Sequence, residues 1–189
     1  VNEALEAFRF NDAALTVYKF IWNEYCDWYI ELTKSKLVDP GSQRMAAQNM
    51  LIHVLDSALK LLHPFMPFIT EEIWQKLPQN EDSIMVSAFP EYREAQTNEA
   101  IEKEMAVIME VITGIRNIRG EMNLNPGLKL NVLVKTQNSA IQQTLQYHGE
   151  YVRELARVEQ LETGANIEKP KVSASSVLGE MDLIIPLEG

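Results

Sequence analysis

The sequence predicts a mainly α-helical fold, an antiparallel helical bundle followed by a small C-terminal α/β module. Up to about residue 123, apolar residues recur at alternating spacings of three and four, which is the period of amphipathic helices. From residue 128 the period changes to two, which indicates a strand. The turn Asn125-Pro126-Gly127 lies at this change, so we expect a bundle over residues 1–123 and a module over residues 124–189.

The first predicted helix covers residues 3–37. The residues expected on its buried face are Ala14, Tyr18, Ile21, Tyr25, Trp28 and Leu32. The pair Pro40-Gly41 is expected to end this helix, because proline and glycine together interrupt a helical pattern. Ser42 is the predicted N-cap of the next helix, since a serine side chain can accept a hydrogen bond from a free backbone N–H group.

Three further helices complete the predicted bundle, over residues 42–63, 67–77 and 97–122. Pro64 and Pro67 separate the first two, because each proline removes a backbone donor and disfavours helix in the preceding residue. The helix at 97–122 precedes the turn directly. It can therefore belong structurally to either half of the chain.

The C-terminal module is expected to alternate strands with one helix. A strand follows the turn, from residue 128 to residue 135. The helix covers residues 138–158, with a break at Gly149 as an alternative. Further extended segments are expected near Leu161, near Val172 and over residues 183–187.

Composition and charge limit the function classes. A chain of 189 residues with 46% hydrophobic and 23% charged residues can bury a core. A net charge of −10 argues against sequence-independent binding of nucleic acid, although a few clustered cations can still form a local, salt-sensitive RNA site. Cys26 is the single cysteine, and no apolar run approaches the roughly 20 residues of a membrane span, so we expect a cytoplasmic protein without a membrane partner. The chain opens inside a helical pattern without methionine, and we expect it to be a piece of a longer protein.

Catalytic and metal-binding patterns are not found in the sequence. His53, His63 and His148 lack the spacing of metal ligands, and no glycine-rich phosphate loop occurs. The acidic residues fall on predicted solvated faces, where nothing pairs two of them in an apolar setting. We therefore expect no catalytic residue, no metal site and no cofactor in this chain.

Three stretches carry a resemblance to a known family. They are Phe8-Arg9-Phe10 together with residues 22–34 (WNEYCDWYIELTK), residues 61–74 (LLHPFMPFITEEIW) and residues 115–123 (IRNIRGEMN). The second resembles the signature of the helical anticodon-binding domain shared by the valyl, isoleucyl, leucyl and methionyl class I aminoacyl-tRNA synthetases. The Asp-Trp-Tyr of the first and the whole of the third are similar to the valyl branch.

The resemblance implies partners and the limits of the chain. The implied partners are the anticodon stem-loop of valine tRNA and the catalytic domain of the same parent chain, with no role for DNA. ATP and magnesium belong to the parent enzyme, whose His-x-Gly-His and Lys-Met-Ser-Lys-Ser signatures are missing here, so the fragment is not expected to be an enzyme by itself. Compared with the family, the bundle lacks part of its first helix, and the module leads toward a missing coiled coil. The alternatives are an isoleucyl or leucyl module, or a helical scaffold that binds proteins only.

Candidate RNA-binding residues follow from how RNA loops are recognised. Unstacked bases are bound by aromatic faces, guanidinium planes and polar side chains, and phosphates are bound by arginine and lysine. The first helix offers Arg9, Phe10, Lys19, Trp22, Asn23 and Lys34. Aromatic residues at helical spacing are usually core, and we expect this of Tyr18, Tyr25 and Trp28. Trp22 and Asn23 lie off that stripe, and both interpretations stay open for them.

A second candidate set lies on the helix before the turn. Its members are Arg116, Asn117, Arg119 and Asn123. The two guanidinium groups could bind phosphate oxygens or stack on a base. They could equally form salt bridges to Glu110, to Glu121 or to a carboxylate of the bundle. Contact with the missing catalytic domain is a third interpretation, ranked behind these two.

Overall fold

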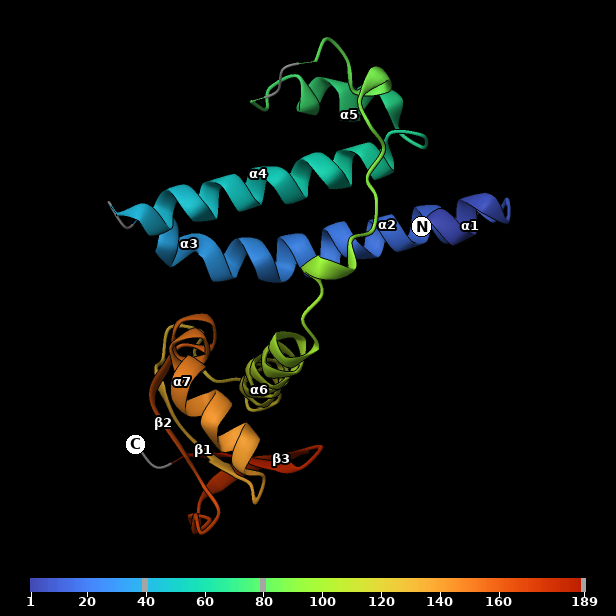
Figure 1. The fold of residues 1–189 in the computed structure, drawn as a ribbon. Coiled ribbons are helices and arrows are strands. Elements are labelled where there is room, and N and C mark those ends of the chain that lie inside the picture. The colour runs from blue at the N-terminus through green and yellow to red at the C-terminus, as the bar shows by residue number, and fades with distance from the viewer. Residues whose placement is uncertain (39–40, 79–80, 188–189) are drawn as a thin grey trace. The chain divides into compact units, whose positions relative to one another are not determined.

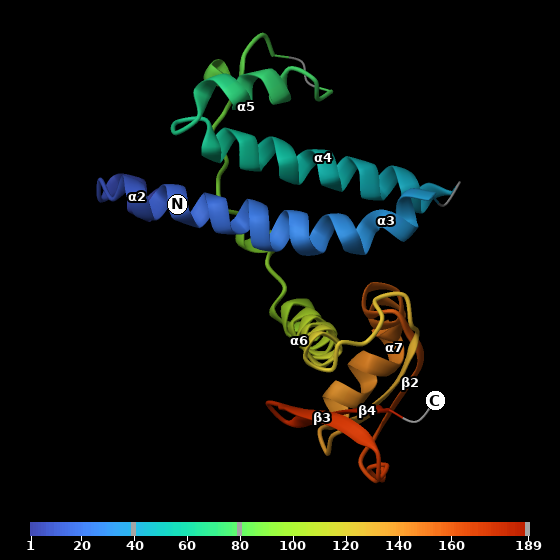
Figure 2. The same cartoon turned by 180° about the vertical axis from the view of Figure 1, so that it is seen from behind.

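The structure, a computed structural model, describes residues 1–38, 41–78 and 81–187. The contacts divide the chain into two compact units, Val1–Arg93 and Glu94–Gly189 (Figures 1 and 2). The expected end of the first helix at Pro40 lies outside the described residues. The mainly helical fold with a small C-terminal α/β module is confirmed.

The regular elements of the first unit, among its described residues, are all helices. They are α1 (Asn2–Glu6), α2 (Phe10–Lys19), η1 (Phe20–Ile30), α3 (Glu31–Val38), α4 (Ser42–Leu62), α5 (Pro67–Trp74) and the short η2 (Ile84–Val86). In Figures 1 and 2, α2, η1 and α3 form one continuous rod, α4 returns beside it, and α5 lies on the other side of α4. The N-cap of α4 is Gly41 and not Ser42 as predicted, and no side chain caps this helix.

The predicted first helix is interrupted at Phe8. This residue has a φ of 55°, in the left-handed region. The Phe8 N–H donates to the Leu5 carbonyl (3.0 Å) and the Arg9 N–H donates to the Ala4 carbonyl (2.7 Å), which is the hydrogen-bond pattern of a Schellman motif. Glycine or asparagine usually occupies this position, because a bulky residue with positive φ is strained. The turn therefore ends α1 and starts α2 in a new direction.

The central segment η1 is a π-helix of 11 residues, and it changes which residues of the rod are buried. The sequence pattern predicts Ala14 and Tyr18 on the buried face, but Ala13 and Val17 are buried instead and Tyr18 is 57% exposed. Hydrogen bonds from residue i to i+5 widen each turn, so a face recurs after more than 3.6 residues. With Tyr25 buried as predicted, the wider turns displace the upstream face by one residue.

The pair α4–α5 is held by polar contacts around a small core of Leu59, Trp74 and Ile84. The Trp74 indole N–H donates to Asp56 Oδ1 at 2.6 Å, and Trp74 is only 1% exposed. At the start of α5, His63 Nδ1 lies 2.7 Å from the hydroxyl of the fully buried Thr70. His63, at the C-terminal end of α4, therefore connects α4 to α5.

The second unit is a four-stranded sheet with two helices. Its elements are η3 (Glu94–Gln96), α6 (Glu99–Glu121), β1 (Leu130–Lys135), α7 (Ser139–Ala156), β2 (Val158–Gly164), β3 (Ser173–Leu178) and β4 (Met181–Pro186). The strand order is β2-β1-β4-β3; β1 and β2 are parallel, and the other neighbours are antiparallel. Both helices pack against the sheet and against each other, over a core that includes Val132, Val134 and Leu183.

Two asparagines start the helices of this unit. The side chains of Asn98 and Asn138 accept hydrogen bonds from backbone N–H groups of the first turn of α6 and α7. The helix α7 runs through Gly149 without a break, and a Cβ there would lie 3.0 Å from Leu161 Cδ2, so the glycine lets the helix pack closely on β2.

The helix α6 belongs to the second unit by its contacts. It packs against α7, β3 and β4. A Cβ at Gly114 would lie 2.7 Å from Leu178 and 2.8 Å from Leu183, so the missing side chain allows close approach to the sheet. The contacts therefore divide the chain after Arg93, and not at the change of hydrophobic period near residue 123.

We expect Trp74→Phe to lower the free energy of unfolding of the first unit by about 1–3 kcal/mol, because it leaves Asp56 without a buried donor and removes ring volume. The matched control is Trp22→Phe, which changes an exposed ring and should stay within about 0.5 kcal/mol of the unaltered chain. All three tryptophans lie within residues 1–93, so urea denaturation followed by tryptophan fluorescence reports on this unit. Equal losses in both variants would contradict the assigned role of Trp74.

Candidate functional site

An exposed aromatic pair lies on the rod of the first unit. The rings of Tyr18 and Trp22 stack with centroids 6.4 Å apart and an angle of 16° between their planes. Each residue is 57% exposed, although most aromatic residues at helical spacing are buried. The prediction that Tyr18 is core is therefore wrong, and the π-helix turns it outward together with Trp22. Two parallel flat rings at the surface form a platform on which a further ring can stack.

Polar candidates lie beside this platform. Lys19 directly follows Tyr18 in sequence, and Asn23 directly follows Trp22. Because Lys19 and Asn23 are four residues apart, they are neighbours of each other on the helix surface. Both are exposed, and neither side chain has a hydrogen-bond or ion-pair partner among the residues that the structure describes. An ammonium group and an amide are thus exposed at the positions that directly follow the two rings in sequence.

The strained turn at Phe8 exposes two more rings. Phe8 is 78% exposed and Phe10 is 55% exposed, and the two contact each other edge to face with centroids 6.2 Å apart. The Arg9 guanidinium lies 3.1 Å from the Asp12 carboxylate, and both side chains are 58% exposed. Such a surface pair contributes little energy, so the guanidinium can exchange this partner for another anion. Arg9 and Phe10 are among the RNA-binding candidates predicted from the sequence. Phe8 is not among them, because no sequence signal indicates its positive φ.

The candidates of the first unit are spread along the rod and do not converge on one pocket. Phe10 and Trp22 are 12 residues apart, as are Trp22 and Lys34, which corresponds to roughly 18 Å for each interval along a helix. Lys34 is exposed and pairs with Glu31 at 2.6 Å. An elongated ligand can contact all of these positions, but a single base cannot.

The arginines of the second candidate set are engaged in the fold. Arg119 Nη1 donates to the carbonyls of Asn125 and Leu128, both at 2.9 Å, and Nη2 donates to the carbonyl of Ala156 at 3.0 Å. Arg116 Nη2 donates to the carbonyl of Leu155 at 3.1 Å. Burial lowers the pKa of Arg119, and the nearby positive charge of Arg157 lowers it further. Structural pairing is thus observed, with backbone carbonyls in place of the carboxylates of Glu110 or Glu121.

The asparagines of this set differ from each other. Asn117 is exposed on α6. Asn123 follows the end of α6 with a φ of 49°, and its N–H donates to the Gly120 carbonyl at 3.2 Å. The next N–H, of Leu124, donates to the Arg119 carbonyl at 3.0 Å, so this is a second Schellman motif. Asparagine tolerates this backbone better than most residues, which gives Asn123 a structural reason to be there.

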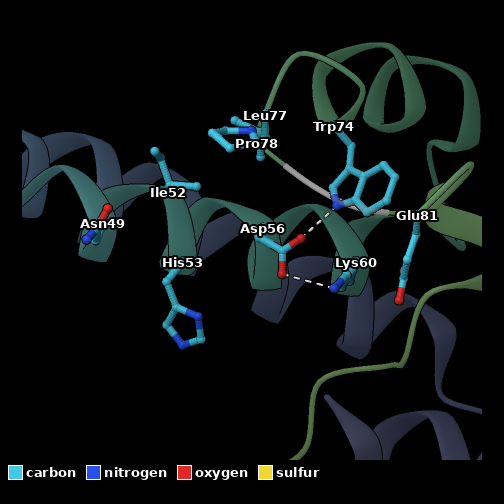
Figure 3. Close-up of a pocket in the computed structure, with 9 residues that line it drawn as sticks. All are labelled: Asn49, Ile52, His53, Asp56, Lys60, Trp74, Leu77, Pro78 and Glu81. Carbon is cyan, nitrogen blue, oxygen red and sulfur yellow. Dashed lines mark hydrogen bonds and ion pairs between the residues drawn. The ribbon is translucent and has the colours of Figure 1, made fainter.

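A hollow of about 440 Å³ lies between α4 and α5 (Figure 3). Asp56 lies at its centre, where one carboxylate oxygen accepts from Trp74 and the other lies 3.0 Å from Lys60 Nζ. The Lys60 ammonium also lies 5.9 Å from the centre of the Trp74 ring. These polar groups satisfy one another, and none of the predicted site residues lines the hollow. Its charges therefore hold α5 on α4.

The described residues form neither a metal-ligand cluster nor a membrane-spanning helix. Within residues 1–38, 41–78 and 81–187, no group of three or more His, Cys, Asp or Glu side chains is arranged to hold a metal ion. In the same described ranges, no helix is both long and apolar enough to cross a membrane.

Comparison with known proteins gives one consistent result. The family model described as the anticodon-binding domain of tRNA ligase matches residues 1–134. The valine–tRNA ligase of Geobacter sulfurreducens is 44% identical over 190 residues, which covers 99% of this chain and 21% of that protein. The enzymes of the same name from Syntrophotalea carbinolica and Lactiplantibacillus plantarum are 42% and 37% identical, over 100% and 99% of this chain and 21% of each relative. The chain thus spans about a fifth of the length of these relatives.

We expect Arg119→Lys to lower the stability of the second unit by about 2 kcal/mol, because an ammonium group cannot bridge the carbonyls of the turn and of the α7 end. Hydrogen exchange of backbone amides, followed by mass spectrometry, should show faster exchange in residues 124–130 and 150–158. Asn117→Ala, on the exposed face of the same helix, is the control and should leave exchange unchanged. Unchanged exchange in Arg119→Lys would refute the bridging role.

Proposed function

The chain belongs to the family of anticodon-binding domains of tRNA ligases, and from this premise we propose that it binds the anticodon stem-loop of valine tRNA. The similarity to valine–tRNA ligases over 99–100% of the chain supports valine as the amino acid. Binding would place the tRNA so that its acceptor end reaches a catalytic domain outside these residues. The fragment itself would supply recognition and not chemistry.

The observation that carries this proposal is the exposed Tyr18–Trp22 pair, with the Phe8 turn on the same rod. Proteins that recognise single-stranded RNA stack splayed bases on aromatic side chains and bind their edges with polar groups. Exposed rings are costly in water unless a partner covers them. Lys19 and Asn23 beside the pair offer donors for a base edge or a phosphate.

The acidity of the chain restricts how RNA can bind. With a net charge of −10, the protein repels RNA at long range, so the attraction must come from local cations and stacking. Arg9, Lys19 and Lys34 are spaced along the rod. A stem-loop that lies along the rod would bring successive phosphates to these cations, with modest and salt-sensitive affinity.

The remaining roles are assigned to the parent protein. We propose that ATP and magnesium act at its catalytic domain, together with valine activation and transfer to tRNA. We also propose a cytoplasmic location, as for a translation enzyme, and no membrane or DNA partner.

Two alternatives remain to be tested against this proposal. An isoleucine- or leucine-specific module would use the same fold, and only the tRNA preference separates it from a valine-specific one. A scaffold that binds proteins is favoured by the exposed apolar residues near α5, where Phe68 is 91% exposed, Met85 77% and Val86 75%. That surface can equally contact another part of the parent chain.

The first test is binding of the chain to valine tRNA at low salt, compared with the same tRNA carrying a changed middle anticodon base. We expect weaker binding after the base change, because the splayed bases lose their stacking or edge contacts. Isoleucine and leucine tRNAs should also bind more weakly. Equal affinity for all four RNAs would contradict anticodon reading by this chain.

The second test locates the recognition surface. Trp22→Ala should lower affinity for valine tRNA by about 5- to 150-fold, since one base–aromatic stack contributes about 1–3 kcal/mol. Phe68→Ala removes a more exposed ring from α5 and should leave the affinity unchanged. A larger loss in Phe68→Ala than in Trp22→Ala would place the RNA elsewhere.

A further inference from the structure

All four arginines of the second unit gather at the C-terminal end of α7. Arg116 and Arg119 reach from α6 to the carbonyls of the last two residues of that helix. Arg153 lies in its last turn, and Arg157 follows it as the C-cap. Because the chain is acidic overall, this concentration of guanidinium groups requires a physical reason.

Capping of the helix explains only two of the four. Cations near a helix C-terminus are stabilising, and Arg116 and Arg119 already bind its carbonyls. The side chains of Arg153 and Arg157 have no hydrogen-bond or ion-pair partner within the part of the chain that the structure describes. Arg157 also has a left-handed backbone, with a φ of 53°, which a residue with a Cβ adopts at a cost.

These two arginines line a hollow of about 510 Å³. Lys129 and Glu159 lie at the same hollow and pair with each other at 3.2 Å, which leaves Glu154 as the other carboxylate there. A Cβ at Gly127 would lie 3.9 Å from Arg157 Nη1, an ordinary van der Waals distance, so the turn at Gly127 lies beside this guanidinium. Burial lowers the pKa of Arg119, and repulsion from the nearby positive charge of Arg157 lowers it further. An anion in the hollow would relieve that repulsion.

We propose that Arg153 and Arg157, with Lys129 beside them, form a phosphate-binding site for the RNA backbone. The planar forks of two guanidinium groups match the oxygens of a phosphodiester. The site is separate from the aromatic surface of the first unit and reads no base. It deepens the proposed function and rests on it, because it takes RNA as the ligand.

The experiment measures binding of the complete chain to two RNA hairpins, one with the valine anticodon loop and one with a scrambled loop, at about 50, 100 and 200 mM salt. The double variant Arg153→Gln with Arg157→Gln should bind both hairpins more weakly by the same factor, about tenfold at the lowest salt. The slope of log affinity against log salt should become shallower by about 1–2, the share of two lost phosphate contacts.

The matched control is Lys169→Gln with Lys171→Gln, which removes two exposed charges of the same unit outside the hollow. It should leave the salt slope nearly unchanged. Equal slopes for the arginine and lysine variants would overturn the site while leaving anticodon recognition intact. If the arginine variant loses affinity for a polyglutamate peptide but binds both hairpins unchanged, the partner is an acidic protein and not RNA. That result would also overturn the proposed phosphate site.

Two results separate this inference from the proposed function. If the unaltered chain binds both hairpins equally and the arginine variant weakens both, the phosphate site stands and loop reading by the first unit is refuted. If the unaltered chain binds neither hairpin, both proposals are overturned.

Discussion

Burial of Tyr25 decides which residues the long rod of the first unit presents to solvent. Tyr25 is 7% exposed, and its hydroxyl donates to the Leu51 carbonyl at 3.1 Å, which ties the middle of the rod to α4. Burial raises the pKa of this phenol, which favours the protonated form that donates this hydrogen bond. Because the π-helical turns around it are wide, the buried face upstream passes through Ala13 and Val17. Tyr18 and Trp22 are exposed as a consequence. The proposed RNA surface therefore depends on this one-residue displacement of the buried face.

The strained backbone and the exposed aromatic rings of the first unit lie on this rod or in the turn before it. Phe8 has a strained backbone, and four aromatic side chains of the rod and its preceding turn are more than half exposed. Strain and exposed apolar surface persist only where the surrounding structure enforces them, and they concentrate at functional sites. By contrast, the hollow between α4 and α5 contains charges that are satisfied internally by Asp56, Lys60 and Trp74. Binding is therefore better sought on the rod than in the hollow.

The second unit uses arginine in two different ways. Arg119 joins the turn after α6 to the end of α7 through three backbone carbonyls, so its loss would loosen the connection between the helices and the sheet. Arg153 in the last turn of α7 and Arg157 at its C-cap have no such partners among the described residues. Residue type alone does not tell which partner an arginine binds, because its guanidinium can donate to a carbonyl, a carboxylate or a phosphate equally well.

The sequence by itself determined most of the helices and strands and the family, because hydrophobic period and turn residues are local signals. The helix over 42–63 and the strand after Gly127 lie where these signals predict them. Tertiary structure alone decided the grouping of α6 with the sheet, which depends on the close approach at Gly114. It also decided the exposure of Tyr18, the left-handed turn at Phe8 and the engagement of Arg119, since each results from packing or backbone geometry between residues that no spacing rule connects. The candidate site was thus predicted as a list of residue types on a helix, whereas the π-helix decided which of these side chains are exposed.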